Sequence, residues 1–129
     1  MILLDTHVLV WMVGEPSRLS RAATGAIRAA QGQGGVGVSA ITLWELASLV
    51  ARGRIQAYGT VDASIRLLIE GVVVQPITPE IAALAAQFPD TFPKDPADRL
   101  IAATARAEGI GLITGDEKLR GSPLLNTIW

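Results

Sequence analysis

Residues 36–52 read VGVSAITLWELASLVAR, and this stretch contains the unit on which the fold is built. It opens with a short β-branched run, Val36–Val38, which predicts a strand. After Ser39, a residue type that commonly caps helices, apolar residues recur at helical spacing over Ile41–Arg52. A strand that leads directly into a helix is the repeating unit of α/β proteins.

The same alternation extends in both directions from this stretch. Further strands are expected at Ile2–Leu4, Val72–Val74, Leu112–Thr114 and Thr127–Ile128. Further helices are expected at His7–Val13, Arg18–Gln31, Val61–Glu70, Glu80–Gln87 and Ala97–Glu108. The strand runs are apolar throughout rather than alternating, which is typical of strands buried on both faces. We therefore expect a three-layer α/β/α domain with a mostly parallel sheet.

Length and composition limit the class of protein. The 129 residues suit a single domain, and half of them are apolar, which indicates a globular core. The chain has no cysteine, which excludes disulfides, thiolate zinc sites and a cysteine nucleophile. Its formal net charge of −1 is not that of a protein that coats nucleic acid by bulk charge. Because there is neither a basic leader nor an apolar run of about 18 residues, we expect a cytoplasmic protein that spans no membrane.

Carboxylates follow two of the predicted strands, at the edge where an open α/β sheet binds ligands. Asp5 comes directly after Ile2–Leu4, and Asp116 follows Leu112–Thr114 past Gly115. Each alone has an ordinary explanation, because Asp is common at helix N-caps and in turns. If the two strands are neighbours, the two charges lie close enough to destabilise the fold unless a cation neutralises them. The repeated placement at one edge therefore indicates a metal site.

Glu45 lies inside the predicted helix Ile41–Arg52. It shares a helix face with Ile41 and Leu49, so its carboxylate should be partly buried. Burying a carboxylate is unfavourable unless it is paired or bound to a metal. An ion pair with Arg52, two turns away, is the alternative to a functional role, and we favour function.

Asp95 and Asp98 lie at the start of the predicted helix Ala97–Glu108. Asp95 directly precedes Pro96, so it is explained as an N-cap, with a secondary role in the site left open. The helix dipole is expected to hold Asp98 ionised, as a metal ligand must be, and we favour it as a ligand. Arg99 has two interpretations, a phosphate contact and an ion pair on the helix surface.

Several other notable side chains are expected to be structural. His7 is the only histidine and, two residues after Asp5, is expected to point away from it. Trp11 and Trp44 fall on apolar stretches and are expected in the core. The basic residues that a nucleic-acid groove would need are scattered along the chain: Arg18, Arg52, Arg54, Lys94, Arg99 and Lys118.

Four sequence elements together resemble the PIN domain and, more narrowly, the VapC-type toxins of bacterial toxin–antitoxin pairs. They occur in the family's order and extend from residue 1 to about residue 119. They are Asp5–Thr6 after an apolar strand, Ser39-x-x-Thr42-x-x-Glu45-Leu46, the run DRLIAATA over 98–105, and Leu112-Ile113-Thr114-x-Asp116. The resemblance implies that residues 1–129 form one PIN-like domain, with a sheet of about five strands and helices on both faces.

The resemblance also implies a metal site and a function. The matching positions are Asp5, Glu45 and Asp98 as the three defining acids, Asp116 as a more variable fourth, and Thr6 and Thr114 as hydroxyls beside the metal's water shell. Such toxins cleave RNA, form homodimers, and are silenced by a cognate VapB-type antitoxin, which also mediates binding to operator DNA. All-oxygen ligands select Mg²⁺ or Mn²⁺ rather than zinc. The implied activity is therefore a metal-dependent endoribonuclease, in which metal-activated water makes a histidine base unnecessary.

Two other functions would use the same acidic residues. An Mg²⁺-dependent phosphatase would use Asp5 as its nucleophile, but such enzymes carry Asp-x-Asp where this chain has Asp5–Thr6–His7. A non-catalytic module would use the same acids to bind a basic segment of a partner. Trapping a phosphoryl group on Asp5 would support the first alternative, and an Asp98→Ala variant that keeps full biological effect would support the second.

Overall fold

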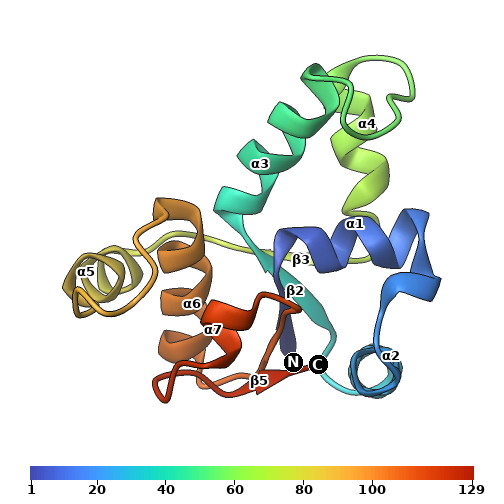
Figure 1. The fold of residues 1–129 in the computed structure, drawn as a ribbon. Helices are drawn as coiled ribbons and strands as arrows, with labels where there is room; N and C mark the ends of the chain where they lie inside the picture. The colour runs from blue at the N-terminus through green and yellow to red at the C-terminus, as the bar shows by residue number, and fades with distance from the viewer.

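Five strands form one parallel sheet in the order β3-β2-β1-β4-β5 (Figure 1). The computed structural model describes all of residues 1–129. The strands are β1 (Ile2–Leu4), β2 (Val36–Ser39), β3 (Val73–Gln75), β4 (Leu112–Ile113) and β5 (Thr127–Ile128). β1 is the central strand, because its residue Leu3 pairs with Gly37 on one side and with Leu112 on the other. The chain thus adds β2 and β3 on one side of β1, and then β4 and β5 on the other.

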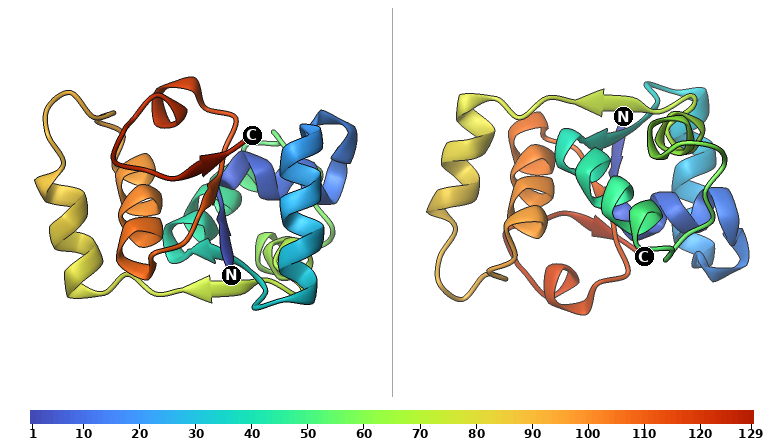
Figure 2. Two further views of the ribbon diagram at one scale, coloured as in Figure 1. Left: turned by 90° about the horizontal axis from the view of Figure 1, so that it is seen from below. Right: turned by 90° about the horizontal axis from the view of Figure 1, so that it is seen from above.

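Helices cover both faces of this sheet. They are α1 (Thr6–Gly14), α2 (Arg21–Gly32), α3 (Ala40–Ala51), α4 (Val61–Leu68), α5 (Pro79–Gln87), α6 (Pro96–Glu108) and α7 (Glu117–Arg120), with a 3-10 turn at Pro16–Arg18. In both views of Figure 2, α5 and α6 lie on one side of the sheet and α1 and α2 on the other. The predicted three-layer α/β/α architecture is confirmed, and all five expected strands are present.

Neighbouring residues of the central strand face opposite layers. Leu3 is fully buried in the cluster that includes Ile81 of α5 and Ile101 of α6. Leu4 is fully buried in the cluster that includes Val8 of α1. Burying a leucine side chain contributes about 1.5–3 kcal/mol, so β1 is anchored firmly from both sides. This anchoring fixes the position of the residue that follows the strand, Asp5.

Most predicted boundaries agree with the structure within two residues, and the exceptions have local causes. α2 begins at Arg21 rather than Arg18, because the chain first makes the 3-10 turn and the Ser20 side chain then caps the helix by accepting from the Ala23 N–H. The four-residue α7 was not predicted, since it is too short to show a helical apolar period.

The prediction that every strand is buried on both faces was wrong for β3. Its three residues are exposed or half-buried, and Val73 is 44% exposed. β3 forms an edge of the sheet, where a short apolar run does not require cover on both faces. None of the helices combines the length and apolar character needed to cross a membrane.

Candidate active site

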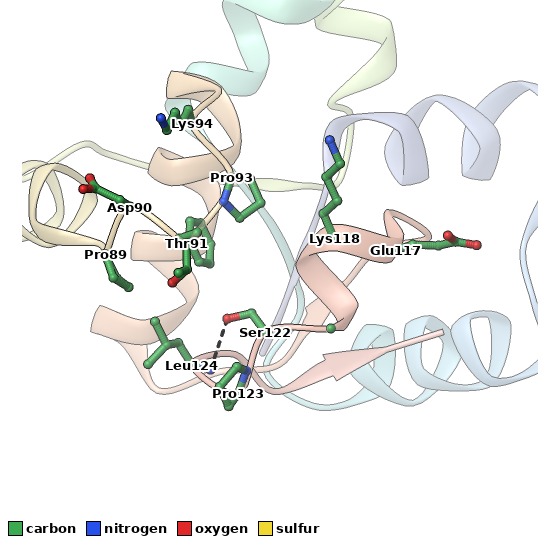
Figure 3. Close-up of a pocket in the computed structure, with 12 residues that line it drawn as sticks. Pro89, Asp90, Thr91, Pro93, Lys94, Glu117, Lys118, Ser122, Pro123 and Leu124 are labelled. Atoms are coloured by element: carbon green, nitrogen blue, oxygen red, sulfur yellow. Dashed lines mark hydrogen bonds between the residues drawn. The ribbon is translucent and has the colours of Figure 1, made fainter.

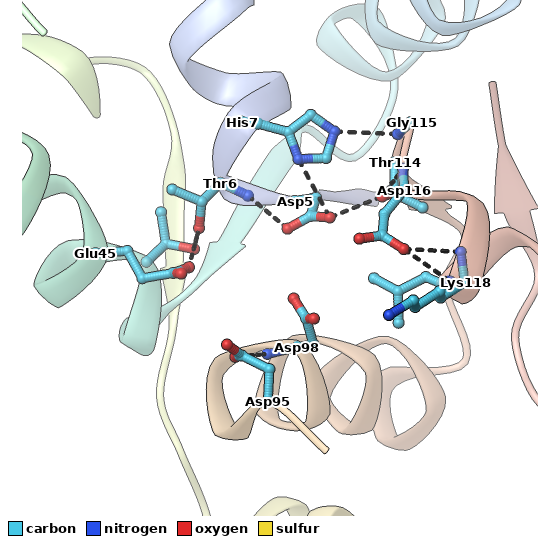
Figure 4. Close-up of polar contacts among 12 residues, drawn as sticks. Asp5, Thr6, His7, Glu45, Asp95, Asp98, Thr114, Gly115, Asp116 and Lys118 are labelled. Carbon is cyan, nitrogen blue, oxygen red and sulfur yellow. Dashed lines mark hydrogen bonds and ion pairs between the residues drawn. The ribbon is translucent and has the colours of Figure 1, made fainter. Parts of the chain in front are cut away.

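The carboxyl ends of β1 and β4 lie side by side at the point where the strand order reverses. Asp5 follows β1, and Asp116 begins the turn into α7 after β4. Ligands of open α/β sheets bind in the crevice at such a reversal. Glu45 from α3 and Asp98 from α6 face the same place (Figure 4), and all four acids line one cavity of about 390 Å³. The structure therefore brings together the four acids that the sequence singled out.

Asp5 is held in place by hydrogen bonds to both of its carboxylate oxygens. It is 5% exposed, Oδ1 accepts from the Thr6 N–H at 2.9 Å, and Oδ2 accepts from the Thr114 hydroxyl at 2.7 Å. The fully buried Thr114 oxygen also accepts from the Asp116 N–H at 3.1 Å. One hydroxyl thus fixes the end of β4 and the carboxylate after β1 relative to each other.

His7 points toward Asp5, contrary to the prediction that it points away. Its Nε2 accepts from the Gly115 N–H at 3.1 Å, so the proton is on Nδ1, which lies 3.4 Å from Asp5 Oδ2. The prediction failed because Asp5 caps α1 and His7 lies in the first turn of that helix. Side chains in a first turn lean back toward the cap, and the alternation of a strand no longer applies. The imidazole also packs edge-on against Trp11, with ring centroids 4.8 Å apart.

Glu45 is half-buried, as its place on the α3 stripe predicted. Its Oε1 accepts from the Thr6 hydroxyl at 2.5 Å, and that hydroxyl lies 2.9 Å from the buried Thr42 hydroxyl. The alternative ion pair with Arg52 does not form, and the one ion pair that an arginine or lysine makes in the chain joins Arg66 to Asp62. Burial raises the pKa of Glu45, the Thr6 hydrogen bond opposes this shift, and the charge on Asp5 adds to it.

Asp98 is half-buried, and its carboxylate has no hydrogen-bond donor. Burial raises its pKa from 3.8 to about 7, and repulsion from Asp5, Asp95, Asp116 and Glu45 contributes to the increase. The expectation that the helix dipole keeps Asp98 ionised was therefore wrong for the metal-free protein, because desolvation and four neighbouring charges outweigh the dipole. A cation among these acids would favour the ionised form again.

Asp95 and Asp116 are both helix caps, but they differ in position. Asp95 accepts from the Asp98 N–H at 3.1 Å, so the predicted cap of α6 is confirmed. Asp116 caps α7 by accepting from the N–H groups of Lys118 and Leu119 at 2.9 and 3.1 Å. Asp116 lines the acidic cavity, whereas Asp95 lines the hollow beside it.

Of the two roles predicted for Arg99, the ion pair on the helix surface does not form, and the phosphate contact stays a prediction. Its guanidinium donates to five backbone carbonyls, those of Ala85, Phe88, Pro89, Phe92 and Pro93, at 2.8 to 3.4 Å. These bonds fasten the segment after α5 to the start of α6. Arg99 thus shapes the protein beside the acids, and it makes no ion pair.

The tryptophans are less buried than their apolar surroundings suggested. Trp44 is 65% exposed and lines the acidic cavity, so its assignment to the core was wrong. The signal was available in the sequence, because Trp44 directly precedes Glu45 and lies off the helix face that buries Leu46 and Val50. Trp11 is half-buried, and the Arg18 guanidinium lies over its ring at 4.3 Å.

The carboxylate oxygens that line the acidic cavity suit a hard divalent cation. The four acids offer only oxygen ligands, which Mg²⁺ and Mn²⁺ prefer. No three acidic or histidine side chains are grouped closely enough to hold one ion as they stand. Burial raises the pKa of both Glu45 and Asp98, and repulsion from neighbouring acids adds to the increase, so a cation among these carboxylates would be a favourable partner.

Comparisons with known proteins agree with this arrangement. The model of the PIN domain matches residues 2–121. Ribonuclease VapC22 of Mycobacterium tuberculosis (strain ATCC 25618 / H37Rv) is 45% identical over 130 residues, which cover 99% of this chain and 98% of that protein.

Two solved complexes share the fold. DNA-bound VapBC from Salmonella typhimurium gives a TM-score of 0.74 at 18% identity, covering 98% of this chain and 97% of that chain. VapBC-1 from nontypeable Haemophilus influenzae gives 0.71 at 24% identity, covering 98% and 96%. At these identities the two complexes support the fold alone. The family match and the full-length relative establish more: this chain belongs to the PIN-domain family and is a homologue of the VapC ribonucleases.

Proposed function

We propose that this protein is a VapC-type toxin, a metal-dependent endoribonuclease that hydrolyses phosphodiester bonds of RNA. One observation carries the proposal: acids from four different elements converge where the strand order reverses. Burial, with added repulsion from the other acids, raises the pKa of Asp98 to about 7. A site that concentrates negative charge in this way is suited to divalent cations and, through them, to phosphate. The 45% identity to a ribonuclease supports RNA as the substrate.

We assign Asp5, Glu45, Asp98 and Asp116 as the ligands of Mg²⁺ or Mn²⁺. Dependence on a divalent cation is general among PIN-domain VapC nucleases, which supports the assignment. When bound, the cation supplies an activated water and stabilises the charge that develops on the phosphate and the leaving oxygen. A protein base is then unnecessary, and the single histidine is already engaged with Asp5 and Gly115.

The chain itself contributes the orientation of the carboxylates. Thr114 and the Thr6 N–H hold Asp5, and the Thr6 hydroxyl holds Glu45. Thr6 and Thr114 therefore act on the carboxylates directly, a more specific role than proximity to the metal's water. Ligands fixed before the substrate arrives need not be ordered during the reaction, which is the main contribution that a protein makes to such a site.

We further propose that a VapB-type antitoxin neutralises the protein by placing an arginine-rich segment in the acidic cavity, since guanidinium and carboxylate groups complement each other in charge and geometry. Binding to DNA is then indirect, through the antitoxin, and the toxin itself is a homodimer. A cytoplasmic location is part of the same proposal, because both partners and the RNA are found there. Co-purification with the product of an adjacent small open reading frame would support this assignment.

The test is cleavage of RNA by the purified protein. We expect cleavage with Mg²⁺ or Mn²⁺, none in excess chelator, and none with the Asp5→Asn variant. The matched control is Glu70→Gln, which also removes one negative charge but at an exposed position outside the cavity. Undiminished cleavage in chelator would disprove the metal mechanism, and wild-type protein that leaves RNA intact with either ion would disprove the ribonuclease assignment. Mapping cleavage ends on total RNA after brief induction would then identify the target.

A further inference from the structure

A groove lies beside the acidic cavity and is larger than that cavity. One wall is formed by residues 89–94, and the other by Glu117, Lys118 and residues 121–124 (Figure 3). We call it the 89–124 groove. Its volume is about 930 Å³, compared with about 390 Å³ for the acidic cavity. Hollows of roughly 300–1,000 Å³ accommodate whole small-molecule ligands, so this groove has room for more than a single side chain.

The 89–124 groove and the acidic cavity are bridged by a third hollow that shares lining residues with each of them. This third hollow has a volume of about 440 Å³ and shares Asp98 and Asp116 with the acidic cavity. On its other side it shares Pro93, Lys94, Glu117 and Lys118 with the groove. A polymer with a phosphate at the acids would therefore continue between the two lysines into the groove.

The cations at this mouth are free to bind phosphate. Lys94 and Lys118 are the only lysines of the chain, and they come from opposite walls of the groove. Both are exposed, and neither forms an ion pair, although Asp95 and Asp116 are close in sequence. In Figure 4 the Lys118 side chain extends from α7 into the region where the carboxylates of Asp116 and Asp98 lie. The two unpaired ammonium groups can bind phosphates of a phosphodiester chain, while the carboxylates beside them bind the metal ion.

One wall of the groove is held by hydrogen bonds from Arg99, and the groove offers no open aromatic surface. Arg99 fastens residues 89–93 through their carbonyls, while Phe92 is 4% exposed and stacks on Phe88 at 4.2 Å. With no aromatic ring available for base stacking, the groove would contact mainly the sugar–phosphate backbone. Such contacts position a strand without reading its sequence.

We propose that the 89–124 groove holds the RNA strand on one side of the scissile phosphate, as a single strand whose phosphates bind Lys94 and Lys118. This inference rests on the proposed function, because it takes RNA as the substrate. A single strand can bend between two fixed walls and past the acids, whereas a duplex is held to its A-form geometry. The lysines contribute to substrate binding, and the acids perform the reaction.

The test uses full-length protein carrying Asp5→Asn, so that RNA binds without being cleaved. Its affinity for a labelled single-stranded RNA is measured as a function of salt, with and without Lys94→Ala and Lys118→Ala together. Removing two phosphate contacts is expected to weaken binding roughly tenfold at low salt and to reduce the slope of log K against log salt by about 1.4. The matched control removes two exposed arginines of α2, Arg21 and Arg28, which do not line the groove and should leave the slope unchanged. An unchanged slope in the lysine variant would refute the proposal.

Kinetics with the wild-type acids separate this inference from the proposed function. We expect the double lysine variant to raise KM with little change in kcat, and Lys→Arg at both positions to restore KM. If wild-type protein cleaves RNA and the variant keeps its KM, the groove assignment fails while the ribonuclease assignment stands. If the protein binds RNA through the lysines but never cleaves it, the ribonuclease assignment fails while the groove assignment stands. Duplex RNA that binds equally well with the same lysine dependence would overturn the single-strand assignment.

Discussion

Replacing Asp98 by Asn is expected to stabilise the metal-free protein while abolishing cleavage. Asn has nearly the same shape but no charge, so it avoids the cost of burying a charge and relieves the repulsion from the surrounding acids. A pKa raised from 3.8 to about 7 corresponds to at most about 4 kcal/mol, because each pKa unit is worth about 1.4 kcal/mol. Asp98 is only half-buried, and solvent screens its neighbours, so we expect about 1–2 kcal/mol at pH 8.

The sign of this effect sets its pH dependence. Between pH 3.8 and about 7 the native state keeps a proton on Asp98 that the unfolded chain releases. The free energy of unfolding therefore falls as the pH rises through this window, and above it the loss is complete. In the Asp98→Asn variant the free energy of unfolding no longer falls through this window. The variant should gain its full advantage over the wild type at pH 8 and lose it near pH 4.

The assay is urea unfolding in excess chelator across this pH range. Glu70→Gln is the control, since it removes an exposed charge outside the acidic cavity and should leave the pH dependence unchanged. Adding Mg²⁺ at about 100 times its Kd should stabilise the wild type by about 2.7 kcal/mol and the variant by much less. The reasoning would be refuted if Asp98→Asn were less stable than the wild type at pH 8. It would also be refuted if the greater stability of the variant persisted at pH 4.

Three further perturbations test other parts of the site. Arg99→Lys should lower the free energy of unfolding by about 2–4 kcal/mol, because one ammonium cannot satisfy five carbonyls; a loss below about 1 kcal/mol in urea would contradict this role. Thr6→Val should raise the pKa of Glu45 further and move the acidic limb of the profile of kcat/KM against pH upward, while Thr6→Ser should restore it. Mn²⁺ should raise the Tm of the wild type but not that of Asp5→Asn, and equal shifts in both would place the ion elsewhere.

The fold and the group of acids could be predicted because both depend on local sequence. Short apolar runs followed by helical periods give the strand–helix units, and parallel strands bring their carboxyl ends to one edge. Asp5 and Asp116 follow directly from this rule, since each stands just past a strand. Glu45 could be found because a carboxylate on an apolar helix face needs an explanation.

The remaining details depend on partners that are distant in sequence. Arg99 binds carbonyls as far back as Ala85, in a segment whose path no local pattern determines. His7 takes its orientation from Gly115, which is 108 residues away. The pKa of Asp98 depends on charges from three other elements as well as its own helix. Each of these properties is set by tertiary structure, so the sequence pattern could locate the residue but not its role.

The four acids of the cavity differ in the hydrogen bonds that stabilise their charges against mutual repulsion. Asp5 is held by a hydroxyl and a backbone N–H, Glu45 by the Thr6 hydroxyl, and Asp116 by the first turn of α7. Hydrogen bonds to a carboxylate favour its charged form, and at Glu45 the Thr6 hydrogen bond opposes the upward pKa shift that burial causes. Asp98 has no such bond, and it is the acid whose pKa reaches about 7. Three of the carboxylates are thus held by hydrogen bonds, and Asp98, which has none, is the ligand whose charge depends most on the arrival of a cation.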